Sequence, residues 1–233
     1  MRNLYLLLAI GLLALLLSGC GKSPSDSNLQ PGARQSPDSS QAADAGHAGT
    51  PSPAPSSPSV EAADRGDSEQ NLLKSAHLIA DMLRSRDLDR LKSVIDSEHG
   101  LLFSPYAHID KEQALTFTAE TLPTFQDTDE LVWGAYDGSG EPIELTFREY
   151  FEMFVYDQDF AGAPEVNVNK LVSQGNAVFN GLDVYPDASY VEFHYPGFEE
   201  EYEGMDWVSL ILVMRPDGED WKLSAIVHSQ WTI

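Results

Sequence analysis

Few residues of this chain have the type and spacing that chemistry requires. Cys20 is the only cysteine among 233 residues, which excludes an internal disulfide framework and any zinc site built from cysteines. The sequence has no Gly-rich phosphate loop, no His-Glu-x-x-His zinc motif and no Gly-x-Ser-x-Gly nucleophile elbow. Thiol, phosphoryl and redox chemistry therefore have no supporting motif, and we expect neither a bound metal nor a cofactor.

One acidic segment has part of the spacing of a calcium-binding loop. Asp137-Gly138-Ser139-Gly140-Glu141 is similar to the middle of such a loop. With Asp137 at the first position, however, Pro142 stands where the loop needs glycine and Arg148 where it needs a bidentate glutamate. A tight turn explains the aspartate and both glycines, and the sequence favours that interpretation.

A second acidic segment lies nearer the C-terminus. Glu199–Glu201, Glu203 and Asp206 stand beside Phe198 and Tyr202. Adjacent carboxylates repel one another unless water or a cation screens them. A solvated loop is the favoured interpretation, and weak calcium binding or docking to a basic partner are the alternatives.

The N-terminus has the features of a secretion signal. Arg2 precedes an unbroken apolar run, Leu4–Leu17, which is shorter than a typical membrane-spanning helix. The run ends at Leu17-Ser18-Gly19-Cys20, a pattern that resembles the lipobox of bacterial lipoproteins. The alternatives are an ordinary secretory signal with a chance cysteine, or an N-terminal anchor helix.

The lipobox resemblance implies that residues 1–19 are a signal peptide and that Cys20 is the lipid-modified first residue of the mature protein. It implies a diacylglyceryl group on the Cys20 thiol and often an acylated, palmitate-like chain on the new N-terminus. Two or more chains give stable membrane anchoring. Gly21 is not the retention residue Asp, so we expect the outer membrane in a two-membrane cell, or the outer face of the plasma membrane in a one-membrane cell.

Charge excludes two classes of partner. The formal net charge is −23. Nucleic acid is unfavourable, because its phosphates need Lys and Arg to displace counterions. An anionic lipid surface is also unfavourable, because its negative headgroups repel a negatively charged protein. The lipid at Cys20 must therefore supply the membrane attachment.

Residues 20–68 have the composition of a disordered tether. They contain seven of the fourteen prolines and no aromatic residue. Such a segment cannot bury enough apolar surface to offset its ordering entropy. We expect a spacer of on the order of 40 Å as a coil, which holds a folded domain, residues 69–233, away from the membrane.

The folded part should begin with helices and end with strands. Apolar spacings of three and four predict a helix over Ser68–Arg84 and a second one from an Asp87 N-cap to about Gly100. Thr146 and Glu149 fit a capping box before a third helix. Alternation and turn signals predict strands at residues 101–103, 131–136, 166–172, 190–195, 207–215 and 221–231. In the last of these, Trp221, Leu223, Ala225, Val227 and Trp231 should share one face. The segment 109–130 is either a loop or a small hairpin.

This order predicts an α+β fold, with the N-terminal helices packed on one face of a curved antiparallel sheet. Element order over residues 70–233, with paired helices running into Gly-Leu-Leu-Phe-Ser-Pro-Tyr and a last strand Trp-Lys-Leu-Ser-Ala-Ile-Val-His, resembles the NTF2-like (SnoaL-like) cone fold. The resemblance implies a ligand pocket at the open end of the cone and allows a homodimer through the open sheet face.

The resemblance also implies which side chains would face the pocket. The ligand-binding candidates are Tyr106, His108, Trp133, His194, Tyr195 and His228. Asp110, Arg148 and Asp157 should lie nearby. In a ketosteroid-isomerase-like enzyme, Asp110 or Asp157 could act as the base and Tyr106 or Tyr195 could hold the oxyanion. The favoured alternative is that the histidines are hydrogen-bonded sheet residues and the tyrosines core aromatics.

Three functions follow as hypotheses. The leading one is a membrane-anchored, non-catalytic domain outside the cytoplasm that binds a small ligand or a protein partner. The second is an acid–base enzyme of isomerase or hydratase type on the same fold. The third is a cation or envelope-polymer binder that works through the acidic surface.

Overall fold

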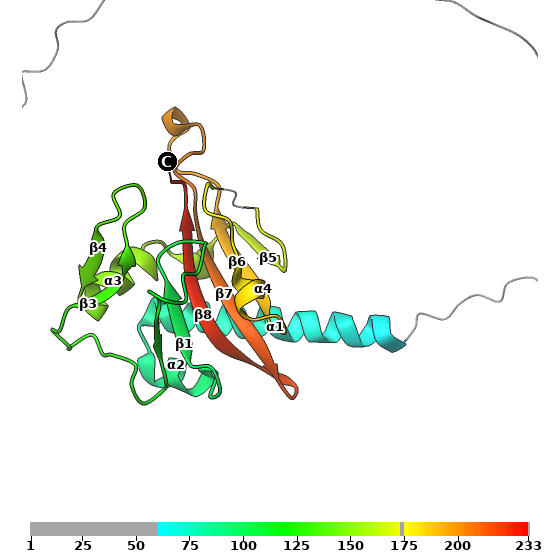
Figure 1. Cartoon of the computed structure of the whole chain (residues 1–233). Helices are drawn as coiled ribbons and strands as arrows, with labels where there is room; N and C mark the ends of the chain where they lie inside the picture. The colour runs from blue at the N-terminus through cyan, green and yellow to red at the C-terminus, as the bar shows by residue number, and fades with distance from the viewer. Residues whose placement is uncertain (1–59, 173–174, 233) are drawn as a thin grey trace, which may run out of the picture. The chain divides into compact units, whose positions relative to one another are not determined.

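The computed structural model describes residues 60–172 and 175–232, with side chains from residue 66 onward (Figure 1). The predicted signal peptide, Cys20 and all but the end of the predicted tether lie outside these residues. Within them, no helix is both long and apolar enough to cross a membrane.

The fold is α+β, as predicted, and its centre is a curved, mostly antiparallel sheet of six strands in the order β2-β1-β8-β7-β6-β5 (Figure 1). The two longest strands, β7 and β8, form its middle. A separate antiparallel pair, β3 and β4, lies beside it. The strands are β1 (Leu101–Ser104), β2 (Leu115–Phe117), β3 (Leu131–Ala135), β4 (Pro142–Leu145), β5 (Glu165–Val168), β6 (Ser189–Tyr195), β7 (Val208–Asp217) and β8 (Asp220–Gln230).

One strand pairing differs from the antiparallel expectation. Strand β1 runs parallel to β8, with Leu102 opposite Ala225 and Ser104 opposite Val227. On its other edge β1 pairs antiparallel with β2, so part of the segment 109–130 is a short edge strand. A parallel pair needs a long connection between its strands, and here almost the whole domain separates β1 from β8.

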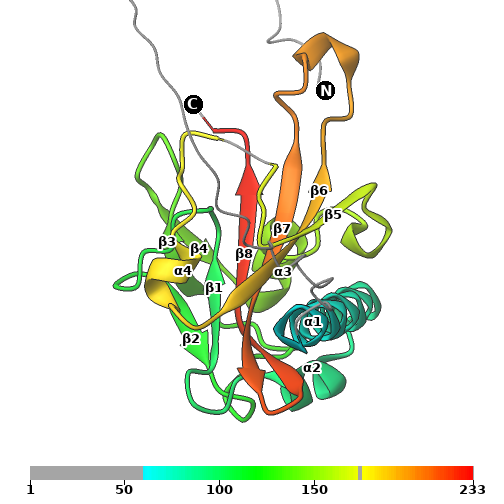
Figure 2. The same ribbon diagram turned by 90° about the vertical axis from the view of Figure 1, so that its right-hand side faces the viewer.

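Helices α1, α2 and α3 cover one face of the sheet (Figures 1 and 2). Leu72, Ile79 and Leu83 of the first helix are buried in one cluster with Phe193 and Leu210 of the sheet. The third helix adds its aromatic side chains to the same cluster. The helices are α1 (Val60–Ser85), α2 (Leu88–Val94), α3 (Phe147–Phe154), α4 (Gly181–Val184) and the 3₁₀ turns η1 (Phe160–Gly162) and η2 (Glu200–Tyr202).

The caps of two helices were predicted correctly. The Asp87 carboxylate accepts a hydrogen bond from the Arg90 amide at 3.1 Å at the start of α2. Thr146 and Glu149 form the reciprocal capping box of α3. Each cap satisfies amide groups that the first helical turn leaves without partners.

The second face of the sheet is also covered. Ile211, Val213 and Val227 are buried in a second cluster together with Tyr185, which follows α4. Other residues of this cluster or packed against it are Leu102, Ile109, Ala114, Leu171, Phe179, Val184, Ala188, Tyr190 and Ala225. The sheet face through which a homodimer was considered is therefore occupied here by the chain itself.

The predicted alternation along the last strand is wrong, because β8 contains a bulge. Met214 pairs with Leu223 and Val213 pairs with Ala225, so Ser224 is an extra residue in the ladder. The extra residue moves Leu223 to the helix-covered face and leaves Ala225 on the opposite face.

Two predicted boundaries of the N-terminal helices also change. Helix α1 begins at Val60 rather than Ser68. Helix α2 ends at Val94 rather than near Gly100, because Ile95 is extended and bridges to Leu223 of β8. The Asp96 amide then donates to the Leu223 carbonyl oxygen at 2.9 Å, so the chain leaves the helix to join the sheet.

Asp96 fastens this junction through its buried carboxylate. It accepts hydrogen bonds from Ser224 Oγ (2.8 Å), Arg215 Nη1 (3.0 Å) and the amides of Glu98 (2.9 Å) and His99 (3.1 Å). Burial alone would raise the pKa of Asp96, but these bonds outweigh it and lower the pKa to about 2. Because the pKa of Asp96 is lower in the folded state than in the unfolded state, ionisation of this carboxylate stabilises the folded state.

Replacement of this carboxylate should change the response of the domain to acid. A pKa of about 2 in the folded state, below the unfolded value, means that the ionised form contributes on the order of 2 kcal/mol above about pH 4. This contribution is lost as the pH falls towards 2. We expect Asp96→Asn to lower the free energy of unfolding at neutral pH and to flatten its decline in acid, as measured by urea denaturation at several pH values. The exposed Asp129→Asn is the control, and an unchanged acid decline in Asp96→Asn would contradict the assignment.

Candidate functional site

A cavity of about 520 Å³ lies between the loop that follows β1 and the β3–β4 hairpin. Segments far apart in the sequence converge there: residues 104–114, residues 133–140 and Ala177. The lining residues are Ser104, Pro105, Tyr106, His108, Asp110, Gln113, Ala114, Trp133, Gly134, Ala135, Tyr136, Asp137, Gly138, Ser139, Gly140 and Ala177. A cavity of this size fits a small molecule.

Three of the six predicted ligand-binding candidates line this cavity. Tyr106 and His108 come from the loop after β1, and Trp133 comes from β3. Asp110, which was expected nearby, also lines it. The segment Asp137–Gly140, which the sequence predicted only as a tight turn, forms the opposite wall of the cavity.

Trp133 is held as a rigid part of the wall. Its side chain is fully buried, stacks on Tyr150 of α3 with ring centroids 4.0 Å apart, and donates from Nε1 to the Leu145 carbonyl oxygen at 2.9 Å. Phe103 and Phe147 pack against the same indole ring. A side chain fixed on all these sides gives the cavity a preformed shape.

Tyr106 links the two walls. Its hydroxyl accepts a hydrogen bond from the Asp137 amide at 3.2 Å, so the hydroxyl proton remains available to a ligand. Burial raises the pKa of Tyr106 further above its ordinary value, at which the hydroxyl is already protonated at neutral pH. Gly134, with φ of 122°, follows Trp133 in the wall opposite, a backbone conformation that glycine adopts most easily.

The electrostatic character of the cavity is neutral to negative. The described lining residues include two carboxylates, Asp110 and Asp137, and neither Lys nor Arg. Asp110 already accepts hydrogen bonds from the Glu112 amide (3.0 Å) and from Gln113 Nε2 (2.7 Å). An anion placed here would therefore find no cationic side chain to pair with.

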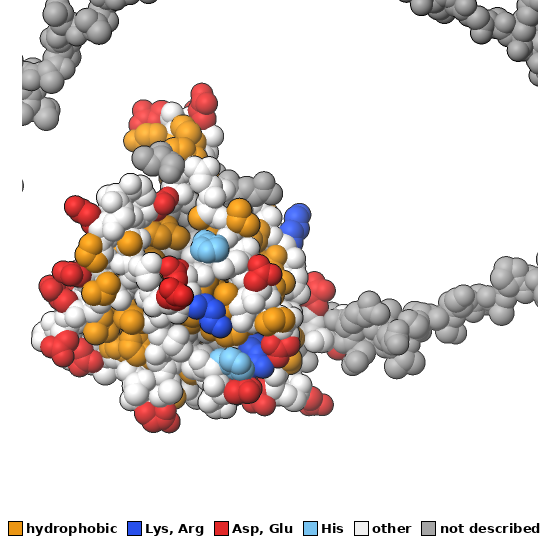
Figure 3. Space-filling view, viewed as in Figure 1, with side chains coloured by type: hydrophobic (Ala, Val, Ile, Leu, Met, Phe, Trp, Pro, Cys, Tyr) orange, Lys and Arg blue, Asp and Glu red, His pale blue; other side chains and the backbone are white. Residues whose placement is uncertain are grey.

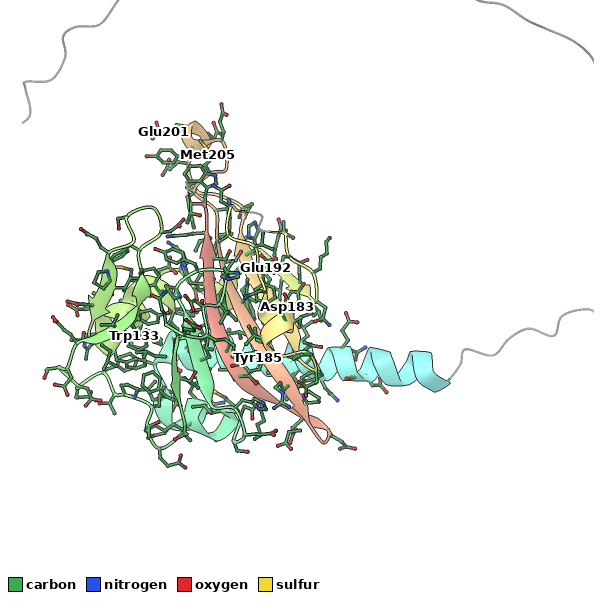
Figure 4. All side chains as sticks on the ribbon, viewed as in Figure 1. Trp133, Asp183, Tyr185, Glu192, Glu201 and Met205 are labelled. Carbon is green, nitrogen blue, oxygen red and sulfur yellow. The ribbon has the colours of Figure 1, made fainter. Side chains whose placement is uncertain are left out.

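His194 belongs to a different buried group, on the second face of the sheet. Its Nδ1 lies 2.8 Å from Ser209 Oγ, which donates to Glu192 Oε1 at 3.0 Å. Glu192 also accepts from the Val172 amide at 2.7 Å. Figure 4 shows Glu192 well separated from Trp133, and none of these residues lines the cavity. The arrangement matches the interpretation of His194 as a hydrogen-bonded sheet residue.

The buried His228 and the partly exposed Asp157 form a pair outside the cavity. His228 Nε2 lies 3.3 Å from Asp157 Oδ1, and the imidazole packs edge-on against Phe154. Neither nitrogen of His228 makes a well-directed hydrogen bond to the described residues. Asp157, which was considered as a catalytic partner of Tyr106, does not line the cavity that Tyr106 lines.

Tyr195 and Arg148 also have structural contacts away from the cavity. The Tyr195 hydroxyl donates to the Asp159 carbonyl oxygen at 2.9 Å, and its ring stacks on Phe198. Arg148 donates from Nη2 to the Phe125 carbonyl oxygen at 2.7 Å.

A second cavity, of about 490 Å³, lies among residues 117–131 with Lys92 and Phe147. Its polar groups bond largely within their own loop: Asp127 accepts from the Thr124 amide at 2.7 Å, and Thr121 Oγ1 from the Thr118 amide at 2.9 Å. The first cavity is therefore the better candidate site.

Across the part of the chain that the structure describes, no group of three or more His, Cys, Asp or Glu is placed to hold a metal ion.

Comparison of the chain with protein-family models, with curated proteins and with solved structures finds no match.

Tyr150, behind Trp133, has a hydroxyl group that should be dispensable for stability. The residue is fully buried, and its hydroxyl has no hydrogen-bond partner among the described residues. We expect Tyr150→Phe to leave the free energy of unfolding unchanged or to raise it by up to about 1 kcal/mol, because a buried unpaired group is removed.

The matched control for this substitution is Tyr156→Phe. The Tyr156 hydroxyl donates to Asp159 Oδ1 at 2.8 Å and accepts from the Ala161 amide at 3.0 Å, so its loss should cost about 1–2 kcal/mol. Chemical denaturation of both variants gives the comparison. An equal loss in the two would show that the Tyr150 hydroxyl has a partner.

Proposed function

We propose that the folded domain binds a small uncharged or cationic ligand in the cavity between residues 104–114 and 133–140, without catalysing its conversion. The observation that carries this proposal is the lining itself. The partly exposed rings of Tyr106 and Tyr136 line the cavity together with two carboxylates, and the described lining offers neither Lys nor Arg. Aromatic faces and carboxylates attract cations and polar neutral molecules, and they disfavour anions.

The preformed walls support binding. Trp133 is fixed by stacking and by its hydrogen bond to Leu145, and Tyr106 is fixed by the Asp137 amide. A site whose side chains are already ordered loses less conformational entropy when the ligand enters. Such a cavity at one end of a sheet is also what an NTF2-like cone would offer, and we include that fold in the proposal.

The proposed location is outside the cytoplasm, at a membrane. The Leu17-Ser18-Gly19-Cys20 pattern supports lipid attachment at Cys20, and residues 20–68 support a spacer between the lipid and the domain. A net charge of −23 leaves the lipid, rather than electrostatics, to hold the protein at an anionic bilayer.

An acid–base enzyme receives less support from the geometry. Catalysis of that kind needs a carboxylate free to take a proton beside a group that holds the oxyanion. Asp157 pairs with His228 outside the cavity, and the carboxylate of Asp110 is already bonded to Glu112 and Gln113.

The charge preference of the cavity can be tested with three probes that share one ring: benzyltrimethylammonium, benzyl alcohol and benzoate. We expect the cation, and more weakly the alcohol, to raise the melting temperature of the full chain in a concentration-dependent way, because a ligand that binds only the folded state stabilises it. Benzoate should have no effect. Stabilisation by benzoate equal to that by the cation would contradict the proposal.

Whether the ligand binds in the candidate cavity can be tested by replacing either of two aspartates, because each replacement removes the same charge. Asp137 lines the candidate cavity and Asp129 lines the second one. Asp137→Asn should weaken the effect of benzyltrimethylammonium by about tenfold in concentration, and Asp129→Asn should leave it unchanged. Equal weakening in both would indicate attraction to net charge instead of a site.

A further inference from the structure

Residues 196–206, all but the last residue of the connection between β6 and β7, project beyond the end of the sheet (Figures 1 and 2). We call this segment the β6–β7 finger. It exposes three large apolar side chains: Phe198 (48%), Tyr202 (48%) and Met205 (47%). Figure 3 shows hydrophobic side chains gathered at its tip beside acidic ones. Apolar groups held together in water at a projecting tip mark an interaction surface.

The finger has a defined internal structure. At its base, the backbone amides of Phe198 (3.0 Å) and Glu199 (2.9 Å) both donate hydrogen bonds to Asp206 Oδ2. Gly197 has φ of 140°, and a side-chain carbon there would lie 2.8 Å from Asp206 Oδ1. Phe198 stacks on Tyr195 of β6, with ring centroids 5.5 Å apart. The base of the finger is thus fixed by Asp206 and by the Phe198–Tyr195 stack, and Tyr202 and Met205 remain about half exposed beyond it.

Charge identifies the partner. Glu199, Glu200, Glu201 and Glu203 surround the apolar tip, and residues 196–206 include neither Lys nor Arg. The same four carboxylates would meet each other in a second copy of this chain, and they would be repelled by anionic lipid or nucleic acid. A surface of basic side chains around an apolar centre is complementary in both respects.

We propose that the β6–β7 finger docks a protein partner that presents lysine or arginine side chains around an apolar patch. Tyr202 and Met205 supply the apolar anchors, and the four glutamates form the rim. Trp231, 40% exposed, follows Gln230, which pairs with Val208 at the base of the finger. Large apolar and aromatic anchors within a charged rim are the usual anatomy of a binding hot spot. This surface is separate from the ligand cavity, and either proposal can fail without the other.

The probe is a short amphipathic lysine–leucine peptide, titrated against the full chain at an ionic strength of about 0.15 M. We expect Tyr202→Ser combined with Met205→Ser to weaken binding about tenfold. The control is Val132→Ser combined with Met153→Ser, which removes apolar side chains of similar exposure (51% and 45%) elsewhere. The control should bind as the unmodified protein does. A lysine–serine peptide of the same charge should bind weakly to every variant.

Two sets of charge variants separate the finger from the net charge. Glutamine at Glu199, Glu200, Glu201 and Glu203 should weaken peptide binding about tenfold, whereas glutamine at the exposed Glu112, Glu130, Glu144 and Glu219 changes the net charge equally and should have little effect. Equal weakening by the two sets would overturn the proposal, as would a failure of the lysine–leucine peptide to bind. Self-association, or binding to phosphatidylcholine vesicles, that is lost with Tyr202→Ser and Met205→Ser while peptide binding is retained would also overturn it.

Discussion

The arrangement of the domain depends on strand β8 being paired on both edges. It is antiparallel to β7 and parallel to β1. The parallel pairing sends the C-terminal end of β1 to the same end of the sheet as the C-terminal end of β8, since Ser104 lies opposite Val227. The loop that carries Tyr106 and His108 therefore emerges where β7 begins and where the β6–β7 finger projects. The backbone hydrogen bonds of one strand thus place both proposed binding surfaces at one end of the molecule.

Burial on both faces gives this strand its fixed register. The helices cover Leu223 and Ile226, while the residues around Tyr185 cover Ala225 and Val227. A shift by one residue would exchange these two sets of side chains between unequal layers. The bulge at Ser224 adapts the strand to both layers and directs the Ser224 hydroxyl to Asp96. Asp96 in turn joins the end of α2 to the sheet. The buried carboxylate and the bulge therefore act together to fix this junction.

Much of the fold could be predicted from local signals in the sequence. The Asp87 cap and the Thr146–Glu149 capping box act over three residues and were confirmed. Most strands were located by alternation and by the turns between them. The parallel β1–β8 pair could not be predicted, because it joins residues more than a hundred positions apart in the chain. The Ser224 bulge lies within the β7–β8 hairpin, but its hydroxyl bonds to Asp96, 128 positions away, which local alternation does not reveal. The early end of α2 has the same cause, since Ile95 leaves the helix to bridge β8.

The candidate site was predicted only in part, because local sequence signals place residues of one loop together but do not show which face of a sheet a strand residue occupies. Tyr106, His108 and Asp110 lie in one loop, so a single correct placement brought all three to the cavity with Trp133. His194 and His228 were assigned to the pocket from strand position alone, which does not determine the face that a residue occupies once a sheet is covered on both sides. Tyr136, Gln113 and the Asp137–Gly140 turn were missed as lining residues, because turn chemistry explained that turn without a ligand.

A ligand site with a preference for positive charge, in the cavity beside Tyr106 and Trp133, can be observed directly by titrating the ¹⁵N-labelled protein with benzyltrimethylammonium and following the amide chemical shifts. We expect saturable shifts concentrated in residues 104–114 and 133–140. Shifts confined to the glutamates of the finger, or spread evenly over the acidic surface, would contradict it.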